Sequence, residues 1–305
     1  MKYIYGPVPS RRLGISLGVS PIPKKTCNYS CVYCQLGRTD HMTNEPENFF
    51  PVADIIKEFE KSIKDNESYD VVTIVGEGEP TLYADLKSLI KEIKARIDKP
   101  VAVITNGALL YDNNVQDALN YADIVLPTFD AYDELSFKKI NRPHGKLSFA
   151  LVYQGLIDFS KQYKGQLWLE MMLVKGYNDD KESIKKYQEK LTKIHYDKLY
   201  LNTPVRPPAE SYIKPIPHKK MAELENQLAG ISIELLTSDG FYSNIEDHKE
   251  AIKSIIKRHP MNQHEIKGFL EKRNCKNPNK ILKDLQKDNS IEVLTYQTYQ
   301  TYRLK

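Results

Sequence analysis

Hydrophobic residues in the first two thirds of the chain follow two alternating patterns, one typical of strands and one typical of helices. Short apolar and β-branched runs predict six strands, over residues 15–21, 70–75, 101–105, 124–129, 167–174 and 198–203. Between them, apolar residues recur every three or four positions, which predicts amphipathic helices over residues 51–64, 82–97, 113–121, 147–163 and 180–194. Strands and helices that alternate in this way predict parallel βαβ units, in a barrel or a doubly wound sheet.

The pattern changes after residue 202. Five prolines between residues 204 and 217 predict a wrapping loop instead of a regular element. The elements predicted after this loop are a helix over 218–228, a strand over 231–236, helices over 245–257, 263–271 and 278–287, and a hairpin of strands 291–294 and 298–304. The last two helices and the hairpin together indicate a winged-helix-like module.

The length of 305 residues suits one catalytic domain of about 200–250 residues and a small appendage. We therefore divide the chain into a barrel domain with an N-terminal extension (1–215), a capping segment (216–257) and a winged-helix-like C-terminal domain (258–305). No run of about 18 apolar residues predicts a membrane helix, and the first residues show no apolar signal core. We expect a cytoplasmic protein that does not interact with a membrane.

The net charge of +4 is unevenly distributed along the chain. Residues 1–38 contain six Lys or Arg and no Asp or Glu, and residues 251–305 contain twelve Lys or Arg against five Asp or Glu. Either end can therefore face an anion such as a nucleic acid. A solvated basic surface explains the C-terminal excess equally well.

Three of the four cysteines, Cys27, Cys31 and Cys34, lie within eight residues, and the fourth, Cys275, is far away. Four cysteines make a poor disulfide scaffold in a chain of this length, and their tight clustering indicates metal binding. Three thiolates can hold a four-iron cluster and leave one iron open, as a catalytic metal centre requires. The alternative is a zinc site with a fourth ligand such as His41.

A second motif, Gly76-Glu77-Gly78-Glu79-Pro80, directly follows a predicted strand. Glycines let the backbone approach a ligand closely, and the Glu79 carboxylate can accept charge-assisted hydrogen bonds from an ammonium group. The alternative is an ordinary turn between a strand and a helix, with a solvated acid.

Polar residues also follow the other predicted strands, among them Asn106, Asp130 and Asn202. In a parallel barrel the carboxyl ends of all strands open on one face, where active sites lie. Taken singly, each of these residues is better explained as a turn or a cap than as a ligand.

The cysteine spacing, with an aromatic residue before the last cysteine, resembles the signature of the radical S-adenosylmethionine (SAM) superfamily. The Gly-Glu-Pro motif resembles the segment with which that family holds the SAM amino group. The resemblance implies an α/β fold, namely a partial (β/α)6 TIM-like barrel to which the winged-helix-like C-terminal domain is added. It implies SAM contacts for Tyr33, Gly78, Glu79, Asn106, Asp130 and Asn202.

The resemblance also implies one [4Fe–4S] cluster on Cys27, Cys31 and Cys34, and an electron donor such as flavodoxin or ferredoxin. In that family one electron from the cluster cleaves SAM to methionine and a 5′-deoxyadenosyl radical. The radical then abstracts a hydrogen atom from the substrate.

Three further stretches, residues 5–14, 140–144 and 206–210, resemble a radical SAM subgroup near the tRNA wyosine-base synthases. This similarity covers roughly residues 1–215. The wyosine enzymes carry a second cysteine triad, whereas only Cys275 remains here, so we expect a single cluster.

Cationic residues in these stretches are candidates for contact with the substrate, because guanidinium groups bind phosphate or carboxylate through two hydrogen bonds. Pairing with Asp or Glu inside the fold is the alternative. The candidates are Arg11, Arg12, Arg142, His144 and Arg206.

Together, the resemblance and the basic tail favour a radical SAM enzyme that acts on a macromolecule. RNA is the leading candidate for this substrate, and the C-terminal domain would contact it. One alternative is an activating enzyme or modifier that acts on a protein or peptide. Another is a cluster-bearing, nucleic-acid-binding regulator without turnover. Detection of 5′-deoxyadenosine would separate this regulator from both enzymes.

Overall fold

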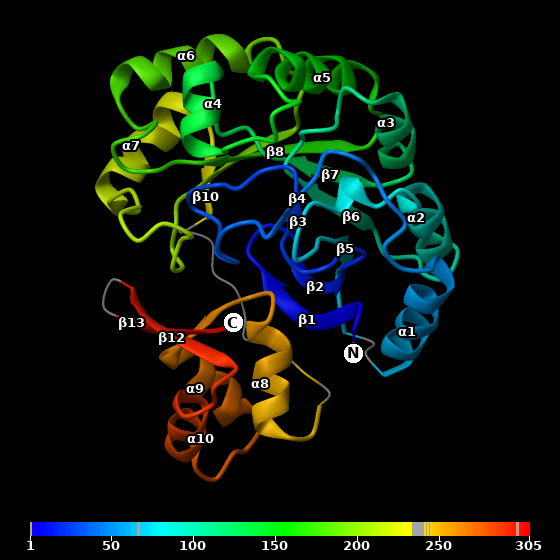
Figure 1. Cartoon of the computed structure of the whole chain (residues 1–305), viewed down its shortest axis with the longest axis vertical. Helices are drawn as coiled ribbons and strands as arrows, with labels where there is room; N and C mark the ends of the chain where they lie inside the picture. Colours follow the sequence, from blue (N-terminus) through cyan, green and yellow to red (C-terminus); the bar gives the residue numbers. More distant parts are fainter. Residues whose placement is uncertain (1, 66–67, 234–240, 242, 244, 297–298) are drawn as a thin grey trace.

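In the computed structural model, residues 2–65, 68–233, 241, 243, 245–296 and 299–305 are described. Within them, eight strands form one curved sheet in the order β1-β2-β5-β6-β7-β8-β9-β10, shown in Figure 1. All neighbours from β2 to β10 are parallel, and β1 is antiparallel to β2. The strands are β1 (Ile4–Ser10), β2 (Gly14–Val19), β5 (Val71–Ile74), β6 (Val101–Thr105), β7 (Ile124–Pro127), β8 (Gln166–Met172), β9 (Lys198–Asn202) and β10 (Ile231–Ser232).

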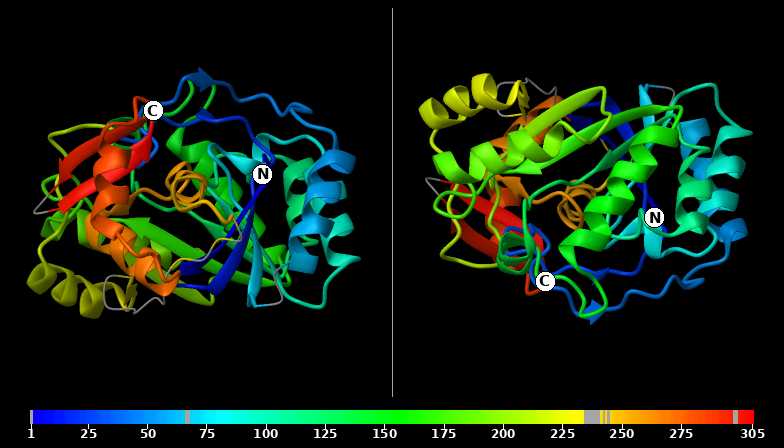
Figure 2. Two further views of the ribbon diagram at one scale, coloured as in Figure 1. Left: turned by 90° about the horizontal axis from the view of Figure 1, so that it is seen from below. Right: turned by 90° about the horizontal axis from the view of Figure 1, so that it is seen from above.

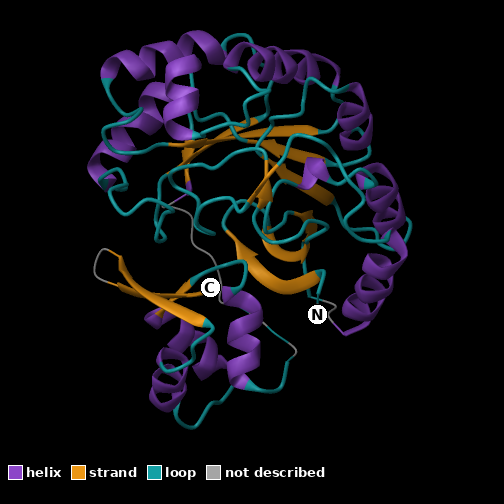
Figure 3. Ribbon diagram, in the orientation of Figure 1, coloured by secondary structure: helices purple, strands orange, loops and turns teal. Residues whose placement is uncertain are grey.

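Helices cover the outer, convex face of this sheet, as Figure 3 shows. They are α1 (Val52–Asp65), α2 (Leu86–Lys94), α3 (Asn113–Leu119), α4 (Glu134–Ile140), α5 (Phe149–Gln162), α6 (Lys181–Leu191) and α7 (His218–Leu228), with a 3-10 turn, η1 (Pro80–Leu82). The alternating βα order confirms the prediction of an α/β fold with a partial, barrel-like sheet.

Both faces of the parallel strands are buried, which explains why their sequences are apolar almost throughout. Successive side chains of a strand point to opposite faces. In β6, Val101 and Val103 join the large core under the helices, whereas Ala102 and Ile104 join a second cluster on the other face. The same alternation continues in β7, β8 and β9, so the inner face of the sheet carries its own apolar layer.

The C-terminal module, here residues 248–305 as described, has its own small core and sheet. It contains α8 (His248–Ile256), β11 (Met261–Asn262), α9 (Gln263–Lys272), α10 (Pro278–Gln286), β12 (Ile291–Tyr296) and β13 (Tyr299–Leu304), with strand order β11-β13-β12. Buried residues of α8, including Ile252 and Ile255, pack in the same cluster as Phe269 of α9 and Tyr302 of β13. A boundary at residue 258 therefore cuts through one hydrophobic core.

This module packs against the barrel beside β1 and near the loop that carries the cysteines (Figures 1 and 2). Val8 of β1 belongs to the core of the module. Arg258 donates to the Lys2 carbonyl at 2.8 Å, and the Tyr296 hydroxyl donates to the Pro204 carbonyl at 2.7 Å. The backbone carbonyl of Lys305 accepts a hydrogen bond from the side chain of Lys24.

Several elements differ from the expectation. The strand β1 was not predicted, because Pro7 and Pro9 suggest a loop, but an edge strand tolerates proline. The short helix α4 and the strands β3 (Thr26–Cys27), β4 (His41–Met42) and β11 also lacked a periodic signal. Parts of the predicted segments 231–236 and 298–304 fall outside the described residues. No described helix is both long and apolar enough to span a membrane.

Candidate functional site

The cysteine loop starts at the end of β3 and is fixed by backbone hydrogen bonds. Cys34 N donates to the Cys31 carbonyl at 3.1 Å, and Gly37 N donates to the Cys34 carbonyl at 3.1 Å. Val32 N donates to the Ile140 carbonyl at 2.9 Å, which ties the loop to the end of α4. The three cysteines are half-buried, and these backbone hydrogen bonds define the turn that carries them.

Two asparagine side chains donate hydrogen bonds to the cysteine sulfurs. Asn106 Nδ2 lies 3.5 Å from Cys27 Sγ, and Asn141 Nδ2 lies 3.6 Å from Cys31 Sγ. Burial raises the pKa of Cys27 to about 12 and the pKa of Cys31 well above its usual value. These thiols therefore stay protonated until a metal replaces the proton, and the amide donors then stabilise the thiolates.

A zinc site would need a fourth ligand. His41 is exposed on the surface. In the described parts of the chain, no three His, Cys, Asp or Glu side chains are grouped closely enough to hold one metal ion.

Gly78 lies against the cysteine segment. A β-carbon at this position would lie 1.9 Å from the Thr26 carbonyl oxygen, next to Cys27. The same carbonyl accepts a hydrogen bond from Glu79 N at 3.0 Å. The glycine is therefore needed for close contact between two segments of the protein, whereas the sequence suggested an approach to a ligand.

Glu79 is buried and its carboxylate accepts four hydrogen bonds. Oε1 accepts from Thr81 N at 2.9 Å, from the Thr81 hydroxyl at 2.6 Å and from the Thr105 hydroxyl at 2.6 Å. Among the described residues, Oε2 accepts from Asn106 N alone, at 2.7 Å. Burial raises the pKa of Glu79, and these donors oppose that rise. The carboxylate joins the end of β6 to η1, and among the described residues Oε2 has capacity for one further donor.

Asp130, after β7, is buried and connects three parts of the site. Oδ2 accepts from the Tyr33 hydroxyl and, at 2.9 Å, from Asn141 Nδ2, while Oδ1 accepts from Met172 N at 2.8 Å. Burial raises the pKa of Asp130 to about 6. Asp130 thus orients the same asparagine that donates to Cys31.

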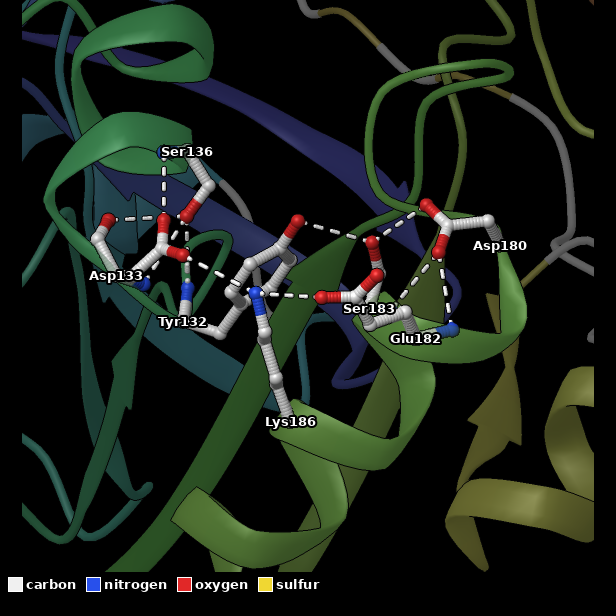
Figure 4. A network of polar contacts seen from close by, with 7 residues as sticks. All are labelled: Tyr132, Asp133, Ser136, Asp180, Glu182, Ser183 and Lys186. Atoms are coloured by element: carbon white, nitrogen blue, oxygen red, sulfur yellow. Dashed lines mark hydrogen bonds and ion pairs between the residues drawn. The ribbon is translucent and has the colours of Figure 1, made fainter.

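A network of polar contacts connects the loop after β7 with the loop after β8, as Figure 4 shows. Asp133 caps α4 and Asp180 caps α6. The Ser183 hydroxyl lies 2.9 Å from the Tyr132 hydroxyl, and Lys186 pairs with Asp133 at 3.5 Å. Because Tyr132 is two residues from Asp130, this network fixes the strand end that carries the buried acid.

A cavity of about 430 Å³ lies on the inner side of the sheet, and we call it the inner cavity. The sequence-predicted residues Tyr33, Cys34, Gly78 and Asn202 line it. Arg258 and His259 of the C-terminal segment line it too, so the module forms part of its wall. Asn106 and Asp130 line a separate space of about 20 Å³.

Asn202 and Arg12 meet at one acid on β8. Asn202 Nδ2 donates to Glu170 Oε1 at 2.9 Å, and Arg12 forms an ion pair with the other oxygen of Glu170. Burial lowers the pKa of Arg12 to about 10. Both polar groups therefore have a protein partner on the inner face of the sheet.

The other residues that were candidates for substrate contact differ in whether they have a partner within the protein. Arg142 contacts Glu210, and Arg206 binds the Pro260 carbonyl at 2.6 Å and Glu265 at 3.3 Å. His144 Nδ1 accepts from Lys146 N at 3.2 Å. Arg11, in contrast, lines the inner cavity with no hydrogen bond or ion pair to any described residue.

Sequence reasoning missed four residues of this region: Asn141, Glu170, Glu210 and Arg258. Asn141 and Glu210 lie inside stretches already quoted for their resemblance, so their position was a usable signal. Glu170 lies within an otherwise apolar strand. A buried acid needs a partner, so its position in the sequence could have marked it as part of a polar site. Arg258 gave no such signal, because its partners, Lys2 and Glu77, are distant in sequence.

A profile of the radical SAM superfamily matches residues 22–187. The chain is 41% identical over 286 residues to "UPF0026 protein MJ1312" of Methanocaldococcus jannaschii, which covers 90% of this chain and 88% of that protein. It is 40% identical over 235 residues to a Brachyspira hyodysenteriae protein called "GTPase Obg", which covers 77% of this chain but 35% of that protein. The chain thus corresponds to about a third of this second relative.

Among solved structures, a radical SAM methyltransferase from Sphaerobacter thermophilus has the same fold. Its TM-score is 0.54 at 12% identity, over 72% of this chain and 68% of that one. The superfamily profile and the relative from Methanocaldococcus jannaschii extend over most of the barrel and include the cysteine loop. The chain therefore belongs to the radical SAM superfamily, as an enzyme of the group that includes the UPF0026 proteins.

Proposed function

We propose that the protein holds one [4Fe–4S] cluster on Cys27, Cys31 and Cys34 and uses it to start radical chemistry from SAM. The observation that carries this proposal is the convergence of the cysteine loop, Gly78 and Asn202 on one cavity at the carboxyl ends of the strands. When bound, the cluster supplies one electron that cleaves SAM and yields the radical for hydrogen abstraction. Three thiols on one loop would suit such a cluster better than a single zinc ion, for which the described residues offer no fourth ligand.

The residues of the chain have distinct tasks in this proposal. Asn106 and Asn141 donate to the sulfurs and stabilise them as thiolates. Asp130 orients Asn141 and holds the Tyr33 hydroxyl. Glu79 Oε2 accepts a hydrogen bond from the ammonium group of SAM, since its second lone pair is available.

Reconstitution with iron and sulfide under anaerobic conditions tests the cluster. We expect close to four irons per chain, by the stoichiometry of the cluster. Replacing Cys27, Cys31 or Cys34 by Ala should abolish the cluster, whereas Cys275→Ala should leave it intact, since Cys275 packs in the core of the module. Iron retention by any of the three variants would contradict the assignment.

SAM binding has its own test. We expect the reduced, reconstituted protein to release 5′-deoxyadenosine slowly even without substrate. Glu79→Gln should weaken SAM affinity about tenfold or more, because a hydrogen bond to a charged group contributes about 1.5–3 kcal/mol. The glutamine oxygen can still accept from Thr81 and Thr105, but its amide nitrogen then faces Asn106 N and cannot accept from it. Thermal melting of the variant is therefore measured as well, so that loss of this hydrogen bond is separated from loss of SAM affinity. Unchanged affinity would remove Glu79 from the SAM site.

The substrate that we propose is a macromolecule, and RNA is the leading candidate. The element order α8-β11-α9-α10-β12-β13 supports a winged-helix-like module. Its helix α10 carries the exposed Lys280 and Lys283 one turn apart, and two further exposed lysines, Lys276 and Lys287, flank the helix at its two ends. Such a set of exposed lysines suits a phosphate backbone. The peptide-directed alternative does not account for these lysines. The nucleic-acid-binding regulator does account for them, and release of 5′-deoxyadenosine separates that regulator from an enzyme.

A further inference from the structure

A second cavity opens between the barrel and the C-terminal module, and we call it the outer cavity. Its volume is about 460 Å³, and Arg11, Arg206, His218, Glu265, Tyr296 and Tyr299 are among its lining residues. The inner cavity shares Arg11, Val205, Arg206 and Glu265 with it. The two cavities are therefore adjacent, with these four residues in the wall of both. His218 and Tyr299 are exposed, so the outer cavity reaches solvent.

Positive charge is concentrated at this junction. Arg206 is compensated by Glu265 at 3.3 Å, and Arg12 by Glu170. Burial, with the charges of Arg206, Arg11 and Arg12, holds the pKa of His259 well below its usual range, so this histidine is neutral and adds no charge. Among the described residues, the guanidinium of Arg11 has no carboxylate partner, whereas Arg12 and Arg206 each have one.

Arg11 acts only repulsively on its described neighbours. Burial is the main cause that lowers the pKa of Arg12 and of Arg206, and the charge of Arg11 adds to the lowering of both. Arg258, which also lines the inner cavity, is 7% exposed and pairs with Glu77 at 3.4 Å, while its Nε has no hydrogen-bond partner among the described residues. Like charges placed together destabilise a fold unless an anion binds there. The junction thus has the electrostatics of a site that is completed by its ligand.

We propose that Arg11 binds a backbone phosphate of a single-stranded nucleic acid that enters through the outer cavity. A guanidinium binds a phosphate through two parallel hydrogen bonds. Tyr299, 41% exposed, offers an aromatic surface on which a base can stack. The reacting nucleotide then extends past Arg11 into the inner cavity, toward Cys34 and Asn202. This inference rests on the proposed function and names the substrate class of that site.

The test is the affinity of the reconstituted full chain for a labelled single-stranded oligouridylate, measured by fluorescence anisotropy at low and at physiological salt. We expect Arg11→Gln to weaken binding about tenfold or more, as for a hydrogen bond to a charged group. The slope of log affinity against log salt should fall by about one. The matched control is Arg96→Gln, which removes the same charge on the outer face, where Arg96 pairs with Glu60 and Glu92.

Two more measurements keep this test specific. Because Arg11 has no described partner, Arg11→Gln should melt at or above the temperature of the wild type, so that lost affinity cannot be attributed to unfolding. Tyr299→Ala should weaken binding, whereas Tyr299→Phe, which retains the ring, should not.

The proposal is overturned if the wild type does not bind the oligonucleotide at low salt, or if Arg11→Gln binds it as well as the wild type does. Tighter, Arg11-dependent binding of a poly-glutamate peptide would also overturn it, in favour of a carboxylate-bearing substrate. Release of 5′-deoxyadenosine is measured separately and without oligonucleotide. Failure of SAM cleavage is therefore distinguishable from failure of this binding site.

Discussion

Glu210 joins two arginines and the cysteine loop at one point. Its carboxylate binds Arg38 through two hydrogen bonds, of 2.9 and 3.0 Å, and also contacts Arg142. Its backbone N–H donates to the Val32 carbonyl, between Cys31 and Cys34, at 3.1 Å. The hydrogen bonds from Arg38 and Arg142 lower the pKa of Glu210 to about 2. The charge of Glu210 therefore stabilises the loop at neutral pH.

This depressed pKa predicts a specific pH dependence. The stabilisation is complete above the pKa of an unfolded glutamate, about 4.3, and is lost as the pH falls toward the folded value. Glu210→Gln should lower the melting temperature at neutral pH by about 2–4 °C, the effect of ~1 kcal/mol in a domain of this size. Thermal melts of both proteins should converge as the pH falls below about 4. A difference that stays constant with pH would contradict the role of the charge.

Gly78 and Gly76 provide a matched pair of substitutions. A β-carbon at Gly78 meets the Thr26 carbonyl at 1.9 Å, which is backbone, whereas at Gly76 the nearest atom is the Ser20 hydroxyl at 3.2 Å. Gly78→Ala should cost about 1–3 kcal/mol or more through overpacking and should reduce the iron retained after reconstitution. Gly76→Ala should have a smaller effect on both. Equal melting temperatures of the two variants would refute this account.

The tasks of single residues were only partly predictable from the sequence. The cysteines and the strand-end residues were marked by spacing and position. The sequence did not indicate which arginines pair with an acid. The acidic partner lies 68 positions away for Arg142 and 59 positions away for Arg206. Arg11 and Arg12 are neighbours in sequence, yet only Arg12 has a carboxylate partner among the described residues.

At the scale of secondary structure, α10 combines a buried and a basic face. Leu282 and Leu285 are buried in the core of the module, whereas Lys280 and Lys283 are exposed. The helix begins with Asn277 as its cap and Pro278 in the first turn. Its lysines therefore project from a well-defined helix.

We predict that the double variant Lys280→Gln/Lys283→Gln weakens oligonucleotide binding and lowers its salt dependence by up to about two in slope. The expected loss is greatest at low salt, where phosphate contacts contribute most. A matched control is Lys181→Gln/Lys185→Gln, which removes two exposed lysines at similar spacing from α6. Equal effects of the two double variants would show a non-specific charge effect and would count against α10 as the contact.

The repeating βα elements were predictable because each strand and helix buries its own apolar pattern. The elements that were missed depend on tertiary context. Strand β1 pairs with β2 at the edge of the sheet, and α4 is a helix of seven residues stabilised by its Asp133 cap. A short segment of this kind has no strong periodicity of its own.

At the scale of the whole molecule, the C-terminal module is part of the wall of the inner cavity. Arg258 pairs with Glu77 at 3.4 Å and lies over the Tyr5 ring at 4.7 Å. The sequence pattern suggested a separate domain that starts at residue 258. In the structure this segment shares a hydrophobic core with α8 and β1, and such a shared core depends on tertiary contacts that a local sequence pattern does not reveal.

A truncation series tests this continuity. A chain that ends at Lys257 retains α8 but loses α9, α10 and β13, so the buried side chains Ile252, Ile255 and Ile256 become exposed. We expect this chain to bind a hydrophobic dye and to aggregate more than a chain that ends at Ile233, which lacks α8 as well. Dye fluorescence and light scattering measure the difference. Greater solubility of the chain that ends at Lys257 would contradict the shared core.

The order of elements along the chain also has a consequence for biosynthesis. The cysteine loop and all parallel strands leave the ribosome before the module that closes the cavity beside them. For that interval, the loop is accessible from the side that Arg258, His259 and β13 later occupy. The cysteine loop is therefore more exposed in a nascent chain that has not yet passed residue 258 than in the finished protein.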